Sequence, residues 1–159
     1  MKTLQINEKD ARRIYPTASD EFRKILEDTF GKSFFSGDIT DRIHSFEDCL
    51  AESGRPDVPA FADAPEDLRN FFKNIYRMVV ISEAYNQGER LDIYDSSVKR
   101  HYQYFLCNNA PAGFAFYGSF YVLDFASAGS GSRLSFTKSE HSKDAGKKFI
   151  RIYQGALEG

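Results

Sequence analysis

The chain has 159 residues, the length of one domain, and 42% of them are apolar. A chain of this size can bury a substantial core. Phe and Tyr supply every aromatic residue, with 15 and 9 copies, which excludes the aromatic-poor composition of a disordered chain. The net charge of −2 argues against a dedicated DNA-binding protein. We therefore expect a single domain over residues 1–159.

The sequence shows no targeting or membrane-spanning segment. Its first residues lack the apolar run of a signal peptide. The longest apolar run, Met78–Ile81, is far shorter than the ~20 residues that a membrane helix needs. We expect a soluble protein without a membrane partner, located in the cytoplasm or within a virion assembled there. Cys49 and Cys107 are both flanked by apolar residues and are predicted to be reduced core cysteines.

Helix signals dominate the first half of the chain. Asn7, Ser19 and Asp38 mark three predicted helix starts, because their side chains can accept hydrogen bonds from a first turn. The first helix should end at Tyr15-Pro16, where proline disfavours a helical residue before it, and the third at Gly54.

The longest predicted helix runs from Pro65 to about Asn86. Proline suits a first helical turn, and Gly88 follows the end. Its residues are apolar around most of the circumference, which is typical of a central, buried helix. One apolar stripe is formed by Leu68, Phe72, Ile75 and Val79. An aspartate at Phe72 or Val79 should therefore prevent folding.

Strand signals dominate residues 100–137. Turn residues at Asn108–Pro111 and Ala126–Ser132 separate aromatic-rich segments. The predicted strands are Arg100–Cys107, then Gly113–Phe125 as one strand or two, then Arg133–Thr137. A last helix over residues 139–157 would be capped by Ser139, and its Gly146 would permit close approach to the sheet.

These elements together predict an α+β fold. N-terminal helices (residues 1–88), with one long central helix, would pack on a three- or four-stranded antiparallel meander (residues 100–137). The C-terminal helix (residues 139–157) would close the core.

Motifs for chemistry are sparse. No CxxC, HxxxH or HExxH spacing occurs, so we expect no metal and no cofactor. The segment Gly129–Arg133 lacks the lysine of a phosphate loop and is followed by a predicted strand, which favours a flexible connection. A hydrolase built on His101, Asp124 and Glu140 would require these three side chains to converge.

The main binding signal is aromatic. Ten aromatic residues lie between Tyr102 and Phe136, and strand alternation places rings on both faces of the predicted sheet. One face must cover the helices. The other is either covered too, by helices or by a second copy of the chain, or forms an exposed surface for a partner or ligand. The candidate binding residues are Tyr102, Tyr104, Asp124, Arg133 and Lys138.

Three segments also carry a resemblance: Ile39–Cys49, Glu83–Gly88, and Gly131–Phe136 leading into Ala145–Phe149. Their order resembles a family of uncharacterised proteins common in gut Bacteroidetes and in their phages and prophages. The family has no established activity, so the resemblance implies a phage or mobile-element setting and no reaction. This chain departs from the family pattern at Glu89–Ile93, where members carry a Trp-containing stretch, and at Ser135, where many have Cys.

The favoured hypothesis is a non-enzymatic interaction or accessory protein of phage or mobile-element origin, with a protein partner or self-association. One alternative is a binder of a small ligand, a sugar or single-stranded nucleic acid through the aromatic sheet, with nucleic acid not favoured. A second alternative is a small hydrolase.

Overall fold

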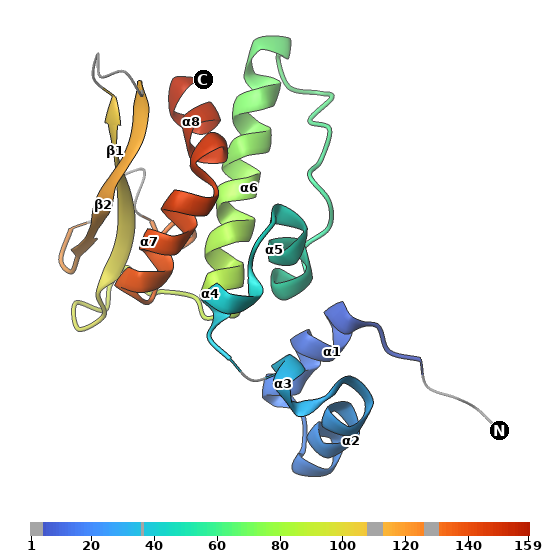
Figure 1. Cartoon of the computed structure of the whole chain (residues 1–159). Coiled ribbons are helices and arrows are strands. Elements are labelled where there is room, and N and C mark those ends of the chain that lie inside the picture. The colour runs from blue at the N-terminus through green and yellow to red at the C-terminus, as the bar shows by residue number, and fades with distance from the viewer. Residues whose placement is uncertain (1–4, 36, 108–112, 126–130) are drawn as a thin grey trace.

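The computed structural model describes residues 5–35, 37–107, 113–125 and 131–159. It confirms the α+β class: helices come first, a two-stranded antiparallel sheet follows, and further helices end the chain (Figure 1). The turn predicted at Asn108–Pro111 lies outside the described residues, as do residues 126–130 of the next predicted turn. No helix in the described part of the chain is long and apolar enough to span a membrane.

The N-terminal helices begin at the predicted caps. α1 (Glu8–Ile14) starts after Asn7, whose side chain accepts a hydrogen bond from the Asp10 backbone N–H at 2.8 Å. A short 3-10 helix containing Pro16 (Tyr15–Thr17) follows α1. α2 (Asp20–Phe30) starts after Ser19, and α3 (Lys32–Phe35) comes directly behind it.

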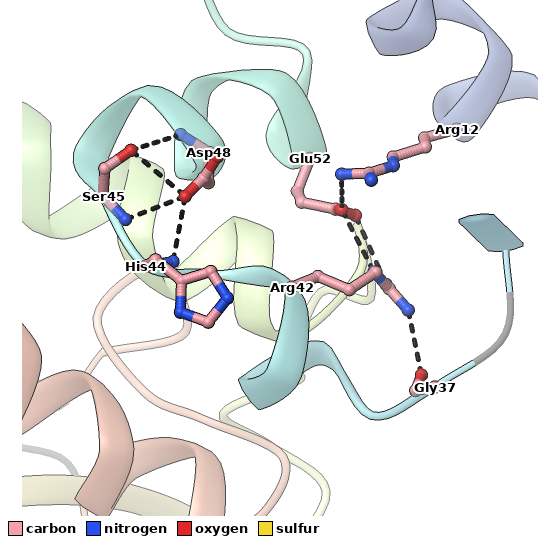
Figure 2. Close-up of polar contacts among 7 residues, drawn as sticks. All are labelled: Arg12, Gly37, Arg42, His44, Ser45, Asp48 and Glu52. Carbon is pink, nitrogen blue, oxygen red and sulfur yellow. Dashed lines mark hydrogen bonds and ion pairs between the residues drawn. The ribbon is translucent and has the colours of Figure 1, made fainter. Parts of the chain in front are cut away.

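The third predicted helix is divided in two, α4 (Ile39–Arg42) and α5 (Phe46–Ser53). The division arises at Ser45, which forms a reciprocal capping box with Asp48 (Figure 2). The Asp48 carboxylate accepts from the backbone N–H groups of His44 and Ser45, at 2.9 and 2.8 Å. These bonds take donors that a continuous helix would use, so a second helix starts here. Gly54 ends α5 in the left-handed conformation, as predicted.

Glu52 of α5 links this helix to α1 and α4 through ion pairs. Its side chain is only 6% exposed and accepts from Arg12 Nη1 at 2.7 Å and from Arg42 Nε at 3.1 Å (Figure 2). Charged hydrogen bonds with so little solvent around them hold a geometry more firmly than a surface ion pair does.

The long helix forms as predicted, but its buried face differs. The 3-10 helix Glu66–Leu68 leads into α6 (Arg69–Tyr85). Leu68 and Phe72 are 41% and 36% exposed, so the predicted stripe is wrong as a core face, and Phe72→Asp would not place a charge in the core. Apart from Asn74, the deeply buried residues of α6 lie in its C-terminal half and include Val80, Ile81, Ala84 and Tyr85.

The sheet consists of β1 (Arg100–Cys107) and β2 (Phe114–Val122). They pair antiparallel from Arg100 opposite Val122 to Cys107 opposite Phe114, with an irregularity after Tyr104. The predicted meander of three or four strands is more than the described residues show. The segment predicted as a third strand, Arg133–Thr137, makes a single bridge between Phe136 and His101.

Side chains of α6 and its end explain why that third strand does not extend. Asn86 donates to the Ser135 carbonyl at 2.8 Å and accepts from the Thr137 N–H at 2.9 Å. The Ser82 hydroxyl bonds the Arg133 carbonyl. Backbone groups satisfied by a helix in this way are not free for a strand ladder.

The predicted C-terminal helix is interrupted at Phe149, giving α7 (Ser139–Lys148) and α8 (Ile150–Glu158). Ser139 is not the cap, because Lys138 takes that position without a side-chain hydrogen bond. Gly146 faces the sheet: a Cβ there would lie 2.5 Å from the Phe116 ring. The predicted close approach of Gly146 is therefore confirmed.

The core lies between α4, α5, the second half of α6, α7, α8 and the inner face of the sheet (Figure 1). Cys49 is a buried free thiol, as predicted, but Cys107 is exposed, because the end of β1 is largely uncovered. The core residues are Ile39, Ile43, Cys49, Val80, Ile81, Ala84, Tyr85, Phe114, Phe136, Ala145, Phe149 and Tyr153.

His141 is buried in this core and should make stability depend on pH. Burial lowers its pKa, although Asp38, whose carboxylate is 3.7 Å from Nε2, and Glu140 oppose the shift; Lys138 adds to it. The unfolded chain therefore binds more protons than the folded one once the pH falls below the unperturbed value of about 6.5. The free energy of unfolding should decrease from pH 7 to 5.

The check is thermal unfolding of wild type and His141→Leu over this pH range. The variant should melt with a shallower pH dependence, the remainder coming from His101, whose pKa burial also lowers. His44→Leu is the matched control at an exposed histidine and should keep the wild-type slope. Equal slopes for wild type and His141→Leu would contradict the assignment.

Candidate functional site

The inner face of the sheet is used for packing. The Gln103 amide donates to the Ser142 carbonyl in α7 and to the Tyr153 hydroxyl in α8, both at 3.1 Å. The Phe105 ring packs on Tyr153 with centroids 5.2 Å apart, and Phe116 lies against Gly146. This face is therefore not available to a ligand.

The outer face of the sheet carries the candidate site. Figure 1 shows α7 on one side of the sheet and no described element on the other. Tyr104 and Phe120 meet edge to face at 4.7 Å and are 48% and 45% exposed. We call this surface the outer aromatic face and define it as Tyr102, Tyr104, Leu106, Tyr117 and Phe120.

Tyr117 and Phe120 were not among the predicted binding residues. They are three apart, and regular alternation would place them on opposite faces. The irregularity opposite Tyr104 inserts one extra residue in β2 between Phe116 and Gly118, which turns Tyr117 outward. Gly118 beside these rings is the one sequence signal for such a bulge.

The outer edge of β2 is the second part of the site. Both backbone hydrogen bonds of His101 go to Phe136, at 3.0 and 2.8 Å, so His101 directs its backbone groups away from β2. Residues opposite each other in an antiparallel pair share this orientation. Tyr121, opposite His101, and Ser119, opposite Gln103, therefore direct their N–H and C=O groups to the outer edge of β2.

The outer edge of β2 lacks two of the features by which natural edge strands discourage pairing. β2 reads FAFYGSFYV and holds no charged residue and no proline, and its bulge at Tyr117 leaves the segment Ser119–Val122 regularly paired with β1. No described strand covers the edge. A nine-residue neutral edge beside exposed rings is thus open to another strand.

The predicted binding residues are brought together only in part. Tyr102 and Tyr104 lie side by side, with ring centroids 5.4 Å apart, and burial with a hydrogen bond to Tyr104 raises the pKa of Tyr102. Asp124 is exposed beyond the end of β2. Arg133 pairs with Glu83 of α6 at 3.0 Å, and Lys138 precedes α7. The two predicted cations therefore lie outside the outer aromatic face.

The hydrolase built on His101, Asp124 and Glu140 remains a prediction. Burial lowers the pKa of His101 and Glu140 opposes that shift, whereas Asp124 is exposed beyond the end of β2. Among the described residues, no three His, Cys, Asp or Glu side chains gather as a metal-binding group.

The fold and its surface define a small α+β protein with an open aromatic sheet face and an unprotected strand edge. No family model matches the sequence, and neither a search of curated proteins nor a search of solved structures found a match.

Proposed function

We propose that the protein is a non-enzymatic interaction protein that self-associates by pairing β2 with β2 of a second copy. The observation that carries this proposal is the neutral outer edge of β2 beside the outer aromatic face. An exposed edge of this kind is a template for strand addition. The second copy is the favoured occupant because it presents the same neutral, complementary edge.

We propose one register for this pairing that satisfies the backbone directions. A two-fold axis at Phe120 places Ser119 opposite Tyr121 of the second copy, and both residues direct their hydrogen-bonding groups outward. The reciprocal bonds between them form a hydrogen-bonded pair on each side of the axis. Such an interface is isologous, which closes the assembly as a dimer.

The same register also uses the rings. Phe120 would face its own copy as a non-hydrogen-bonded pair, in which side chains approach most closely. The two outer aromatic faces would then join across a four-stranded sheet made of two strands from each copy. The phage or mobile-element origin suggested by the resemblance, and a location in the cytoplasm or in a virion, remain part of this proposal.

Disulfide trapping tests the register. In a Cys107→Ser background, Phe120→Cys should form a disulfide-linked dimer under mild oxidation, because directly opposed Cβ atoms of such pairs are about 4.5–5.5 Å apart. Tyr104→Cys is the matched control: it is equally exposed on the same face but lies one strand away from the edge. It should remain monomeric under the same oxidation.

Analytical ultracentrifugation tests the association itself. Wild type should sediment as a monomer–dimer equilibrium. Ser119→Pro should shift it to monomer, because proline removes an N–H that β1 does not use. A wild-type protein that stays monomeric at every concentration, or a trapped Tyr104→Cys dimer equal in yield to Phe120→Cys, would contradict the proposal.

The same rings suit the alternative, stacking on a sugar or on single-stranded bases. The arrangement favours it less, because Arg133 and Lys138 do not accompany the rings. A monomeric wild type whose melting temperature rises with an oligosaccharide or an oligonucleotide would favour this alternative.

A further inference from the structure

A second surface, independent of the sheet, is lined by arginines. An open hollow of about 470 Å³ lies where the ends of α5 and α6 meet the segment 131–133. It shares no residue with the outer aromatic face. Its cationic lining residues are Arg13, Arg55, Arg90 and Arg133.

The lining of this hollow is positively charged, whereas the chain as a whole is slightly negative. Four arginines face two glutamates, Glu83 and Glu89, whereas the whole chain has a net charge of −2. A smaller hollow of about 200 Å³ adjoins it through Arg13, Ser53 and Gly88 and adds Arg12 and Arg42, both of which are paired with Glu52. No lysine lines either hollow. Arginine is the residue whose planar fork matches the oxygens of carboxylate and phosphate.

Glu83 shows that the arginine side chains can converge on an oxyanion. Its carboxylate takes two bonds from Arg55, at 2.6 and 2.7 Å, and one from Arg133 at 3.0 Å. The Glu83 side chain is 23% exposed, so this cluster faces the hollow rather than the core.

The remaining positive charge is only partly compensated. Arg13 reaches Asp10 at 3.2 Å with 61% of its side chain exposed. Arg90 is exposed and makes no hydrogen bond or ion pair within the described residues. The backbone places it here, because Gln87 and Gly88 both adopt positive φ, 52° and 82°, and turn the chain back at the end of α6.

We propose that this hollow binds the phosphate group of a small molecule. The four arginines of the lining outnumber Glu83 and Glu89 by two, and this excess of positive charge suits a phosphate group. The hydroxyls of Ser53 and Ser132 line the same hollow and can donate to phosphate oxygens. The volume is that of a small-molecule site.

Ser132 and Arg133 belong to the Gly129–Arg133 segment, for which the sequence favours a flexible connection and not a phosphate loop. The inferred site does not use a loop of backbone N–H groups at a helix start. It uses side chains from four separated segments, and no local motif would reveal it.

Calorimetric titration with inorganic pyrophosphate, at ionic strength held constant with sodium chloride, tests the site. Wild type should bind, and Arg90→Gln should weaken binding about tenfold or more, since a charged hydrogen bond is lost. Arg90 makes no internal contact within the described residues, so this variant should fold as wild type does. Arg151→Gln, an exposed arginine on α8, removes the same charge elsewhere and should bind pyrophosphate as wild type does.

Glu83→Gln should change the affinity for pyrophosphate in the opposite direction. It releases Arg55 and Arg133 from their internal carboxylate and should tighten pyrophosphate binding, whereas Glu158→Gln at the exposed end of α8 should not. Inorganic phosphate should bind the same site more weakly than pyrophosphate. Absence of pyrophosphate binding by wild type, or equal weakening by Arg90→Gln and Arg151→Gln, would refute the phosphate site and leave the dimer proposal untouched.

Discussion

Replacing Arg100 with methionine should lower the free energy of unfolding by about 2–3 kcal/mol, because leaving a buried hydrogen-bond acceptor without a donor costs about 1–3 kcal/mol. Arg100 is fully buried. It makes no ion pair within the described residues, and its guanidinium is held by backbone carbonyls alone. Methionine fills a similar volume but leaves those carbonyls without donors.

The acceptors explain why the effect should be large. Arg100 Nη2 donates to the carbonyls of Leu123 and Phe125, at 2.7 and 2.9 Å, just beyond β2. Nη1 donates to Asp92 and Ile93, at 3.4 and 3.2 Å, in the segment before β1. One side chain thus joins the chain entering the sheet to the chain leaving it.

Urea unfolding followed by circular dichroism measures the change. Arg100→Lys should also destabilise the protein, because a single ammonium cannot match the spread of four carbonyls. Arg151→Met is the exposed control and should stay within about 0.5 kcal/mol of wild type. An Arg100→Met protein as stable as that control would show that the carbonyls find other donors.

Local signals were sufficient for some helix boundaries, but not for the divisions at Ser45 and Phe149. The starts at Asn7, Ser19 and Asp38 and the end at Gly54 were predicted because their hydrogen bonds close within one turn of chain. The buried face of the long helix was not predicted, because rings surround α6 and its periodicity does not select one face. Which half of α6 is covered depends on α7 and α8, far along the chain.

The sheet shows the same limit. Alternation placed Tyr102 and Tyr104 on one face, and the structure agrees. The predicted third strand does not extend, because Asn86 and Ser82, about 50 residues earlier, form hydrogen bonds with the backbone of residues 133–137. The bulge at Tyr117 depends on pairing with β1. The arginine hollow depends on segments that lie far apart in the sequence. Such features arise from tertiary contacts that no local pattern encodes.

Gly146→Ala should destabilise the protein by about 1–2 kcal/mol, although alanine is normally favoured over glycine in a helix by about 1 kcal/mol. The reason is the close packing of α7 on the sheet. A Cβ at position 146 would lie 2.5 and 2.6 Å from two Phe116 ring atoms and 2.9 Å from Gln103 Cγ. The ring cannot retreat freely, because Phe105 packs on it with centroids 6.0 Å apart.

A double-mutant cycle separates the two opposing effects. Phe116→Val removes the ring atoms that the new methyl group would meet and replaces them with a β-branched side chain, which also favours a strand. In that background Gly146→Ala should become neutral or stabilising, because the intrinsic helix preference then acts without the clash. Urea unfolding of the four proteins measures the effect of Gly146→Ala in each background. The difference between the two effects is the coupling energy of this contact. An equal loss in both backgrounds would place the cost elsewhere, for instance at the Gln103 side chain, whose hydrogen bonds to Ser142 and Tyr153 hold α7 and α8 against the inner face. Either outcome locates the contact that keeps the helices on one face of the sheet and so leaves the other face open.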